Sequence, residues 1–170
     1  MPPLPSVPGV RLATAEDLDR IALVAAAAFF WSPTFQFQRP RYRDFPADTV
    51  ASYRVEYEAA LRDPACAVLV AEDVVEANEA DYVYEALQDA YQGHGKTERA
   101  VVGVCSISLK PDSCFFGHLQ PASNPPAFLG APSDGPAASI HRHWASDHRR
   151  DQCAAAMELY KATTQPAKSA

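Results

Sequence analysis

The densest group of side chains with metal-binding chemistry consists of His141, His143 and His148. Imidazole nitrogens are common ligands of zinc and copper, and two of them can share an ion when they lie two residues apart on a strand or four apart on a helix. His141 and His143 meet only the strand condition, and His148 follows His143 by five residues. Because no cysteine or carboxylate completes an evident ligand set, the pattern favours surface histidines and predicts no metal site.

A second pattern, Gly95-Lys96-Thr97, matches the end of a phosphate-binding loop, in which a lysine and a hydroxyl contact a triphosphate and its magnesium ion. Ala90 stands where that loop needs its first glycine, and no apolar strand precedes it. The sequence therefore excludes nucleotide hydrolysis here. It also contains no Gly-x-Ser-x-Gly turn and no Cys-His pair that spacing singles out, so catalytic residues stay unassigned.

The composition limits the classes of partner. A chain of 170 residues with 48% hydrophobic content and a formal charge of -6 has the length of one domain. No Lys/Arg cluster is longer than Arg149-Arg150, so we expect no nucleic-acid partner. No apolar run approaches the about 20 residues that span a bilayer, and the proline-rich start does not resemble a signal peptide. We therefore expect no membrane association and a soluble, cytoplasmic protein.

The four cysteines are widely spaced and form no C-x-x-C pair. Cys66 and Cys105 lie in apolar, strand-like runs, which predicts buried free thiols at both positions.

Hydrophobic periodicity predicts the elements that must position any site. Residues 1–8 read as an extended leader, 9–13 as a strand and 15–30 as an amphipathic helix, with Thr14 and Asp17 forming a capping box. The aromatic run 29–37 is expected to be a loop, because Pro33 interrupts the helical pattern. A second helix is expected over 47–62, and two apolar runs, 65–71 and 100–109, are expected to be neighbouring strands of one sheet. This order predicts an α+β (α/β-like) fold.

The remaining segments are more polar or richer in proline. Residues 72–99 read as an acidic, solvated excursion with a possible short helix over 82–91. Residues 110–139 read as a Pro/Gly-rich insertion loop, and 140–170 as a helix over about 146–163 followed by a frayed tail.

The run from Val10 to Phe29, VRLATAEDLDRIALVAAAAF, resembles the amino-terminal end of the GNAT superfamily of acetyl-CoA-dependent N-acetyltransferases. The resemblance covers roughly residues 9–109. It implies a β-α-α-β-β start to a central mixed sheet, acetyl-CoA as cofactor, and a small-molecule or peptide amine as acceptor. Because the connection between the first two helices of this family commonly lines the acceptor pocket, Phe30, Trp31 and Phe35 are expected to bind substrate. Core packing is the other interpretation of these aromatic side chains.

Members of the family bind the pyrophosphate of the cofactor with the motif Gln/Arg-x-x-Gly-x-Gly/Ala, which follows a strand. None of the glycines of this sequence lies in such a motif. The expected function is therefore that of the amino-terminal half of a GNAT-like N-acetyltransferase, truncated or incomplete as given, with cofactor-binding residues unassigned.

Two alternatives stay open, a noncatalytic α+β binding or regulatory module and an unrelated α+β enzyme. A missing fourth strand would also expose one edge of the 100–109 strand, which predicts a possible homo-oligomer.

Overall fold

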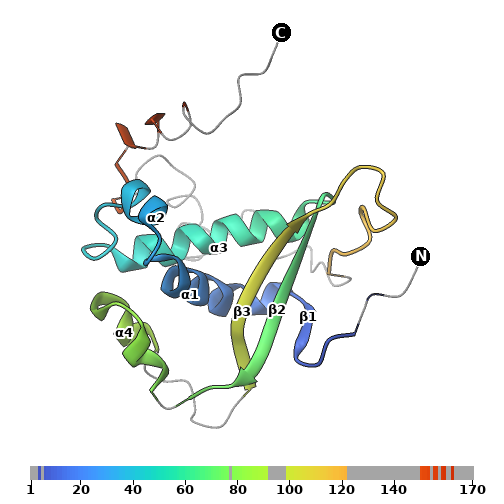
Figure 1. Ribbon diagram of the computed structural model, residues 1–170, viewed down its shortest axis with the longest axis horizontal. Coiled ribbons are helices and arrows are strands. Elements are labelled where there is room, and N and C mark those ends of the chain that lie inside the picture. The colour runs from blue at the N-terminus through green and yellow to red at the C-terminus, as the bar shows by residue number, and fades with distance from the viewer. Residues whose placement is uncertain are drawn as a thin grey trace, which may run out of the picture.

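A three-stranded antiparallel sheet forms one layer of the fold (Figure 1). The computed structural model of the chain describes residues 4, 6–76, 78–91, 99–121, 150–153, 155–156, 158–159 and 162. The strands β1 (Val10–Leu12), β2 (Cys66–Val74) and β3 (Arg99–Ser108) lie in the order β1-β2-β3. The predicted α+β fold is confirmed. Both strand pairs in the described part are antiparallel, whereas the resemblance implied a mixed sheet.

The helical layer packs on one face of this sheet. The helices α1 (Leu18–Phe29) and α3 (Pro46–Arg62) contact each other, and they contact β3 and β2 respectively. Their apolar faces meet alternate side chains of the strands, as the period of two in a strand requires. The resulting core includes Leu18, Ile21, Tyr57, Leu61, Val68 and Val70.

The connection from β1 to α1 is set by hydrogen bonds around Asp17. The 3-10 turn η1 (Ala15–Asp17) precedes α1, and the Thr14 N–H donates to Asp17 Oδ2 at 2.7 Å. The guanidinium of Arg11 binds both carboxylate oxygens of Asp17 at 2.7 Å and also reaches Glu72 on β2. The predicted capping box is present, and Arg11 joins it to the sheet.

The segment after α1 differs from the prediction. We expected an irregular aromatic loop because proline breaks helices, but a short helix, α2, spans Pro33–Gln38. Pro33 occupies the first turn of α2. N–H groups in the first turn have no acceptor within a helix, so the lack of an N–H in proline costs no hydrogen bond there. Pro46 begins α3 in the same way. The prolines here start helices instead of ending them.

Between β2 and β3, the acidic excursion folds back over the end of α1. It contains the 3-10 turn η2 (Glu79–Tyr82) and the helix α4 (Glu85–Tyr91), which was expected over 82–91. Leu87 of α4 is fully buried, and Arg20 of α1 forms an ion pair with Glu79 of η2. These contacts hold the excursion against α1.

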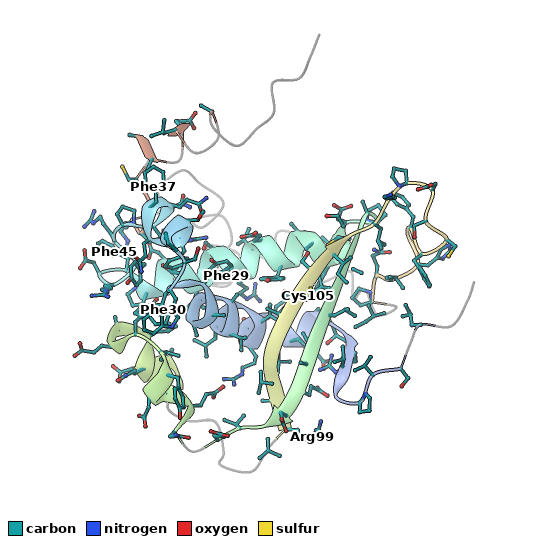
Figure 2. All side chains as sticks on the ribbon, in the orientation of Figure 1. Phe29, Phe30, Phe37, Phe45, Arg99 and Cys105 are labelled. Atoms are coloured by element: carbon teal, nitrogen blue, oxygen red, sulfur yellow. The ribbon has the colours of Figure 1, made fainter. Side chains whose placement is uncertain are left out.

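Two cysteines were expected to be buried in the strands. This prediction is wrong for Cys105, which lies exposed on β3 (Figure 2). Cys66 on β2 is half-buried. Residues 110–121 form turns without regular elements, and the rest of the Pro/Gly-rich loop, 122–139, lies outside the described residues. His141, His143 and His148 and much of the expected last helix lie outside them as well.

Candidate functional site

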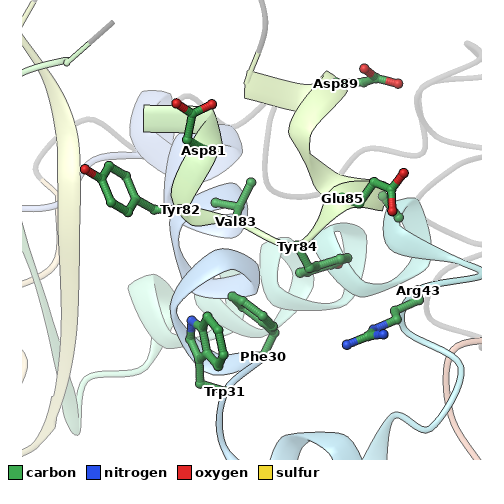
Figure 3. Close-up of a pocket in the computed structure, with 10 residues that line it drawn as sticks. Phe30, Trp31, Arg43, Asp81, Tyr82, Val83, Tyr84, Glu85 and Asp89 are labelled. Atoms are coloured by element: carbon green, nitrogen blue, oxygen red, sulfur yellow. The ribbon is translucent and has the colours of Figure 1, made fainter. Parts of the chain in front are cut away.

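A cleft of about 850 Å³ opens between the end of α1 and the η2–α4 excursion (Figure 3). Phe30 and Trp31 line it from the α1 side, and Arg43 lines it from the loop between α2 and α3. The excursion contributes every residue from Asp81 to Ala86, together with Asp89. Segments about 50 residues apart in the sequence therefore form one cleft.

The walls of the cleft combine aromatic rings with negative charge. Trp31 is 72% exposed and Tyr82 69% exposed, so both rings are available to a ligand. Three carboxylates, those of Asp81, Glu85 and Asp89, line the same cleft. Carboxylates and the faces of aromatic rings both attract cations.

The carboxylates follow the geometry of α4. Glu85 and Asp89 are four residues apart, so they lie on one face of the helix, separated by about 6 Å along its axis. Among the described residues of the lining, Arg43 is the cation, and its Nε donates to Tyr42 Oη at 2.9 Å. These described residues supply three carboxylates and one guanidinium, so their formal charge is net negative.

Tyr84 and Phe30 form the aromatic floor of the cleft, and a chain of ring contacts continues from them into the core. Tyr84 packs against Phe30 with a ring-centroid separation of 5.1 Å and against Tyr42 at 5.0 Å. Tyr42 in turn contacts Phe35 at 5.2 Å, edge to face. Tyr84 is only 6% exposed, and within the described part of the chain its buried hydroxyl has no hydrogen-bond partner. Burial raises the pKa of this phenol, so it stays protonated.

A buried ion pair lies behind this floor. Arg39 Nη1 donates to Asp151 Oδ2 at 2.8 Å and to Ser52 Oγ at 2.7 Å, and Thr49 Oγ1 donates to Asp151 Oδ2 at 3.1 Å. The Arg39 guanidinium lies 4.6 Å from the centre of the Tyr53 ring. Burial raises the pKa of Asp151, against the opposing effects of Arg39 and Thr49.

The structure separates the three residues that were expected to bind substrate. Phe30 and Trp31 line the cleft, with their rings 4.4 Å apart. Phe35 is buried in the core, stacked on Tyr53 and contacting Tyr42, and does not line this cleft. A substrate-binding role for Phe30 and Trp31 stays a prediction.

The opposite wall of the cleft was not predicted from the sequence. Asp81-Tyr82-Val83-Tyr84-Glu85 has two tyrosines between two acidic residues, a composition that could have drawn attention to this segment. It was interpreted as a solvated excursion because charged runs usually are. Its proximity to Trp31 depends on tertiary packing.

The described residues contain neither a metal-ligand cluster nor a membrane-crossing helix. In that part of the chain, no group of three or more His, Cys, Asp or Glu side chains is arranged to hold a metal ion. None of the helices described there has the length and apolar composition of a membrane-crossing segment.

Comparisons with known proteins give a partial relationship. No protein-family model matches the chain, and no solved structure matches it. A protein of the fungus Stachybotrys chartarum named Acetyltransferase is 38% identical to it over 72 residues, which is 42% of this chain. The matched stretch spans 31% of the length of that relative. The match therefore indicates a relationship over one segment.

Proposed function

We propose that this chain belongs to an amine N-acetyltransferase of the GNAT kind, and that the cleft between Trp31 and α4 binds the amine acceptor. One observation carries the proposal: the cleft brings exposed aromatic rings and three carboxylates together around a space large enough for a small molecule. The partial similarity to a protein named Acetyltransferase supports the reaction class. An aliphatic amine is a cation at neutral pH, so its charge is complementary to the cleft.

The spacing of the carboxylates favours a diamine or a lysine-like side chain over a larger rigid amine. Glu85 and Asp89, about 6 Å apart along α4, can each contact one ammonium group of a four-carbon diamine. The ring of Trp31 on the opposite wall can cover the methylenes or an ammonium group. Exposed ion pairs contribute about 0.2–1 kcal/mol each, so we expect weak, salt-sensitive binding, with a dissociation constant of tens of millimolar from the two ion pairs and tighter only through the aromatic contacts.

Carboxylates bind the ammonium form of the acceptor, whereas only the neutral amine attacks a thioester. The bound ammonium group must therefore lose a proton before it reacts. The cleft can concentrate the cation and orient it. The base that removes the proton is assigned to no residue in the described part of the chain.

The described residues do not fit the pyrophosphate of acetyl-CoA. Each described helix of seven or more residues has a carboxylate in its first turn, namely Asp19 in α1, Asp48 in α3 and Glu85 in α4. Negative charge at a helix N-terminus opposes the binding of an anion there. Acetyl-CoA as the acetyl donor therefore stays part of the proposal, and no step is derived through it.

The test measures both ligands on the purified 170-residue chain. Calorimetric titrations use acetyl-CoA as the donor, desulfo-CoA as an analogue that cannot carry an acetyl group, and 1,4-diaminobutane as the acceptor. An assay of amine-dependent thiol release from acetyl-CoA follows. Diamine binding that is lost at high salt supports the acceptor site, and thiol release supports the complete reaction. Failure to bind the diamine, with or without cofactor, would contradict the proposal.

A second candidate function, self-association or docking through the sheet, is favoured by β3. Within the described residues, β3 pairs with β2 on one side and with no strand on the other. Val102 and Ile107 on this strand are 40% and 42% exposed. An open edge with apolar side chains can pair with a second copy of the chain.

The cytoplasmic location expected from the sequence stays a prediction.

A further inference from the structure

Two adjacent residues, Arg150 and Asp151, attach a distant part of the chain to the helices behind the cleft. The side chain of Asp151 is 0% exposed, and its contacts with Arg39 and Thr49 cross more than 100 positions of sequence. The Asp151 carbonyl also accepts a hydrogen bond from the Arg41 N–H at 3.3 Å. Both the backbone and the side chain of Asp151 are therefore fixed to the α2–α3 region.

Arg150 makes a separate attachment at the start of α3. Its guanidinium donates to both carboxylate oxygens of Asp48, at 2.7 and 3.1 Å, and its backbone N–H donates to the same carboxylate at 3.0 Å. The guanidinium lies 4.7 Å from the centre of the Phe45 ring. Neither Asp48 nor Phe45 lines the cleft. The Arg150 attachment therefore offers a control for the Asp151 attachment.

Only the Asp151 attachment continues to the floor of the cleft. Arg39, which Asp151 neutralises, covers the rings of Tyr53 and Phe35 at 4.6 and 5.5 Å. Phe35 contacts Tyr42, and Tyr42 contacts Tyr84, whose other neighbour is Phe30 in the cleft wall. The charge of Asp151 also acts on the Tyr84 hydroxyl, raising the pKa of that phenol in the same direction as burial. Packed rings transmit a displacement because protein interiors are close-packed.

We infer that Asp151 is a positioning residue for the cleft: by neutralising Arg39, it holds Tyr42, and through it the Tyr84 ring of the cleft floor, in place beneath the bound cation. Without Asp151, the buried Arg39 guanidinium would carry an uncompensated charge. Arg39 would then move toward water and lose its contacts with Tyr53 and Phe35. The rings above it would lose their support, and the η2–α4 wall that Tyr84 anchors would open more often.

The first test measures this opening without a ligand. Amide hydrogen exchange is followed by mass spectrometry on the full chain, comparing wild type, Asp151→Asn and the control Asp48→Asn. Residues 79–91 are expected to exchange about tenfold faster in Asp151→Asn than in the other two proteins, since local opening sets the exchange rate. Equal rates in this segment for both variants, or acceleration spread evenly over the chain, would overturn the inference.

A milder variant keeps the test available if Asp151→Asn folds poorly. Thr49→Val preserves the shape of a fully buried side chain and removes the hydroxyl that donates to Asp151. It is expected to accelerate exchange in residues 79–91 by a smaller factor, and unchanged exchange there in a folded Thr49→Val protein would count against the inference.

The second test concerns ligand binding and rests on the proposed function. The dissociation constant of 1,4-diaminobutane is expected to rise about tenfold in Asp151→Asn and to change less than about twofold in Asp48→Asn, because only the first variant disturbs the floor. A wild-type protein that binds no diamine refutes the proposed function, while the exchange measurement still decides the role of Asp151. Diamine binding that is unchanged in Asp151→Asn would overturn that role.

Discussion

The buried hydroxyl of Tyr84 allows a prediction in which removing a polar group stabilises the protein. The ring packs against Phe30 and Tyr42, and within the described residues the oxygen has no hydrogen-bond partner. The substitution Tyr84→Phe leaves the ring contacts in place and removes only the oxygen. The folded state then no longer holds a polar atom that has left water without compensation.

The magnitude follows from the cost of such an atom. A buried polar group without a hydrogen bond costs about 1–3 kcal/mol relative to its hydrated state. Part of this cost is offset by relaxation, so we expect the free energy of unfolding to rise by about 1 kcal/mol in Tyr84→Phe. In a chain of this size, that corresponds to an increase in Tm of roughly 2–4 °C.

Tyr42→Phe is the matched control, because the same chemical change removes a hydroxyl that is in use. Tyr42 Oη accepts a hydrogen bond from Arg43 Nε at 2.9 Å. Its loss is expected to lower the free energy of unfolding by about 0.5–1.5 kcal/mol. The free energy of unfolding should thus change with opposite sign in these two substitutions, although the two tyrosine rings are in contact.

Urea denaturation followed by circular dichroism measures both variants, with the slope of free energy against denaturant checked for constancy. A Tyr84→Phe protein destabilised by about 1 kcal/mol or more would show that the hydroxyl has a hydrogen-bond partner, and would refute the reasoning. Equal destabilisation of the two variants would lead to the same conclusion.

Three further predictions concern other parts of the fold. Burial acts to raise the pKa of Asp17, but hydrogen bonds from Arg11 and Thr14 lower it overall. A carboxylate whose pKa is lowered in the folded state stabilises the protein above its unfolded pKa of about 3.9 and loses that contribution as the pH falls through the folded pKa. In urea titrations at acid pH, the free energy of unfolding should therefore fall more steeply with decreasing pH in wild type than in Asp17→Asn. Equal slopes would contradict the role of this carboxylate. Val102→Lys, on the open edge of β3, is expected to reduce self-association in sedimentation velocity at high protein concentration, and unchanged association would rule out this edge. Leu87→Ala on α4 should lower the free energy of unfolding by about 2–5 kcal/mol in urea, since Leu87 is fully buried, and a loss below about 1 kcal/mol would show that α4 is not firmly packed.

Periodicity predicted the long elements well because each has one buried face. The spacing of Leu18, Ile21, Ala22 and Ala25 predicted α1, and all four side chains are buried. The apolar runs that predicted β2 and β3 pair along nearly their whole lengths. Such patterns can be recognised in the local sequence, and tertiary packing then buries the apolar face that they mark.

Errors arose where one residue type has two structural uses. Pro33 was interpreted as a break, but proline also suits the first turn of a helix, and α2 begins there. Cys105 was expected to be buried because its run is apolar, yet it lies on the exposed part of the outer strand. Position in the sheet decided its exposure, and the run by itself carries no information about position.

The candidate site was only half predictable. The aromatic pair Phe30-Trp31 attracted attention because the segment is unusually rich in rings. Tyr84 and Glu85 belong to a segment whose local composition is that of a solvated loop, and their role depends on packing against α1. The contact between Arg39 and Asp151 joins residues 112 positions apart, and no local pattern specifies it.

The most direct test of the central claim is a calorimetric titration of the chain with 1,4-diaminobutane at low ionic strength. It compares wild type with the double variant Glu85→Gln, Asp89→Asn and with Glu56→Gln, which removes one exposed carboxylate from α3 outside the cleft. We expect saturable binding that weakens about two- to thirtyfold in the double variant and stays unchanged in Glu56→Gln, given about 0.2–1 kcal/mol for each of the two exposed ion pairs. No binding to wild type, or equal binding to all three proteins, would contradict a cation site in the cleft.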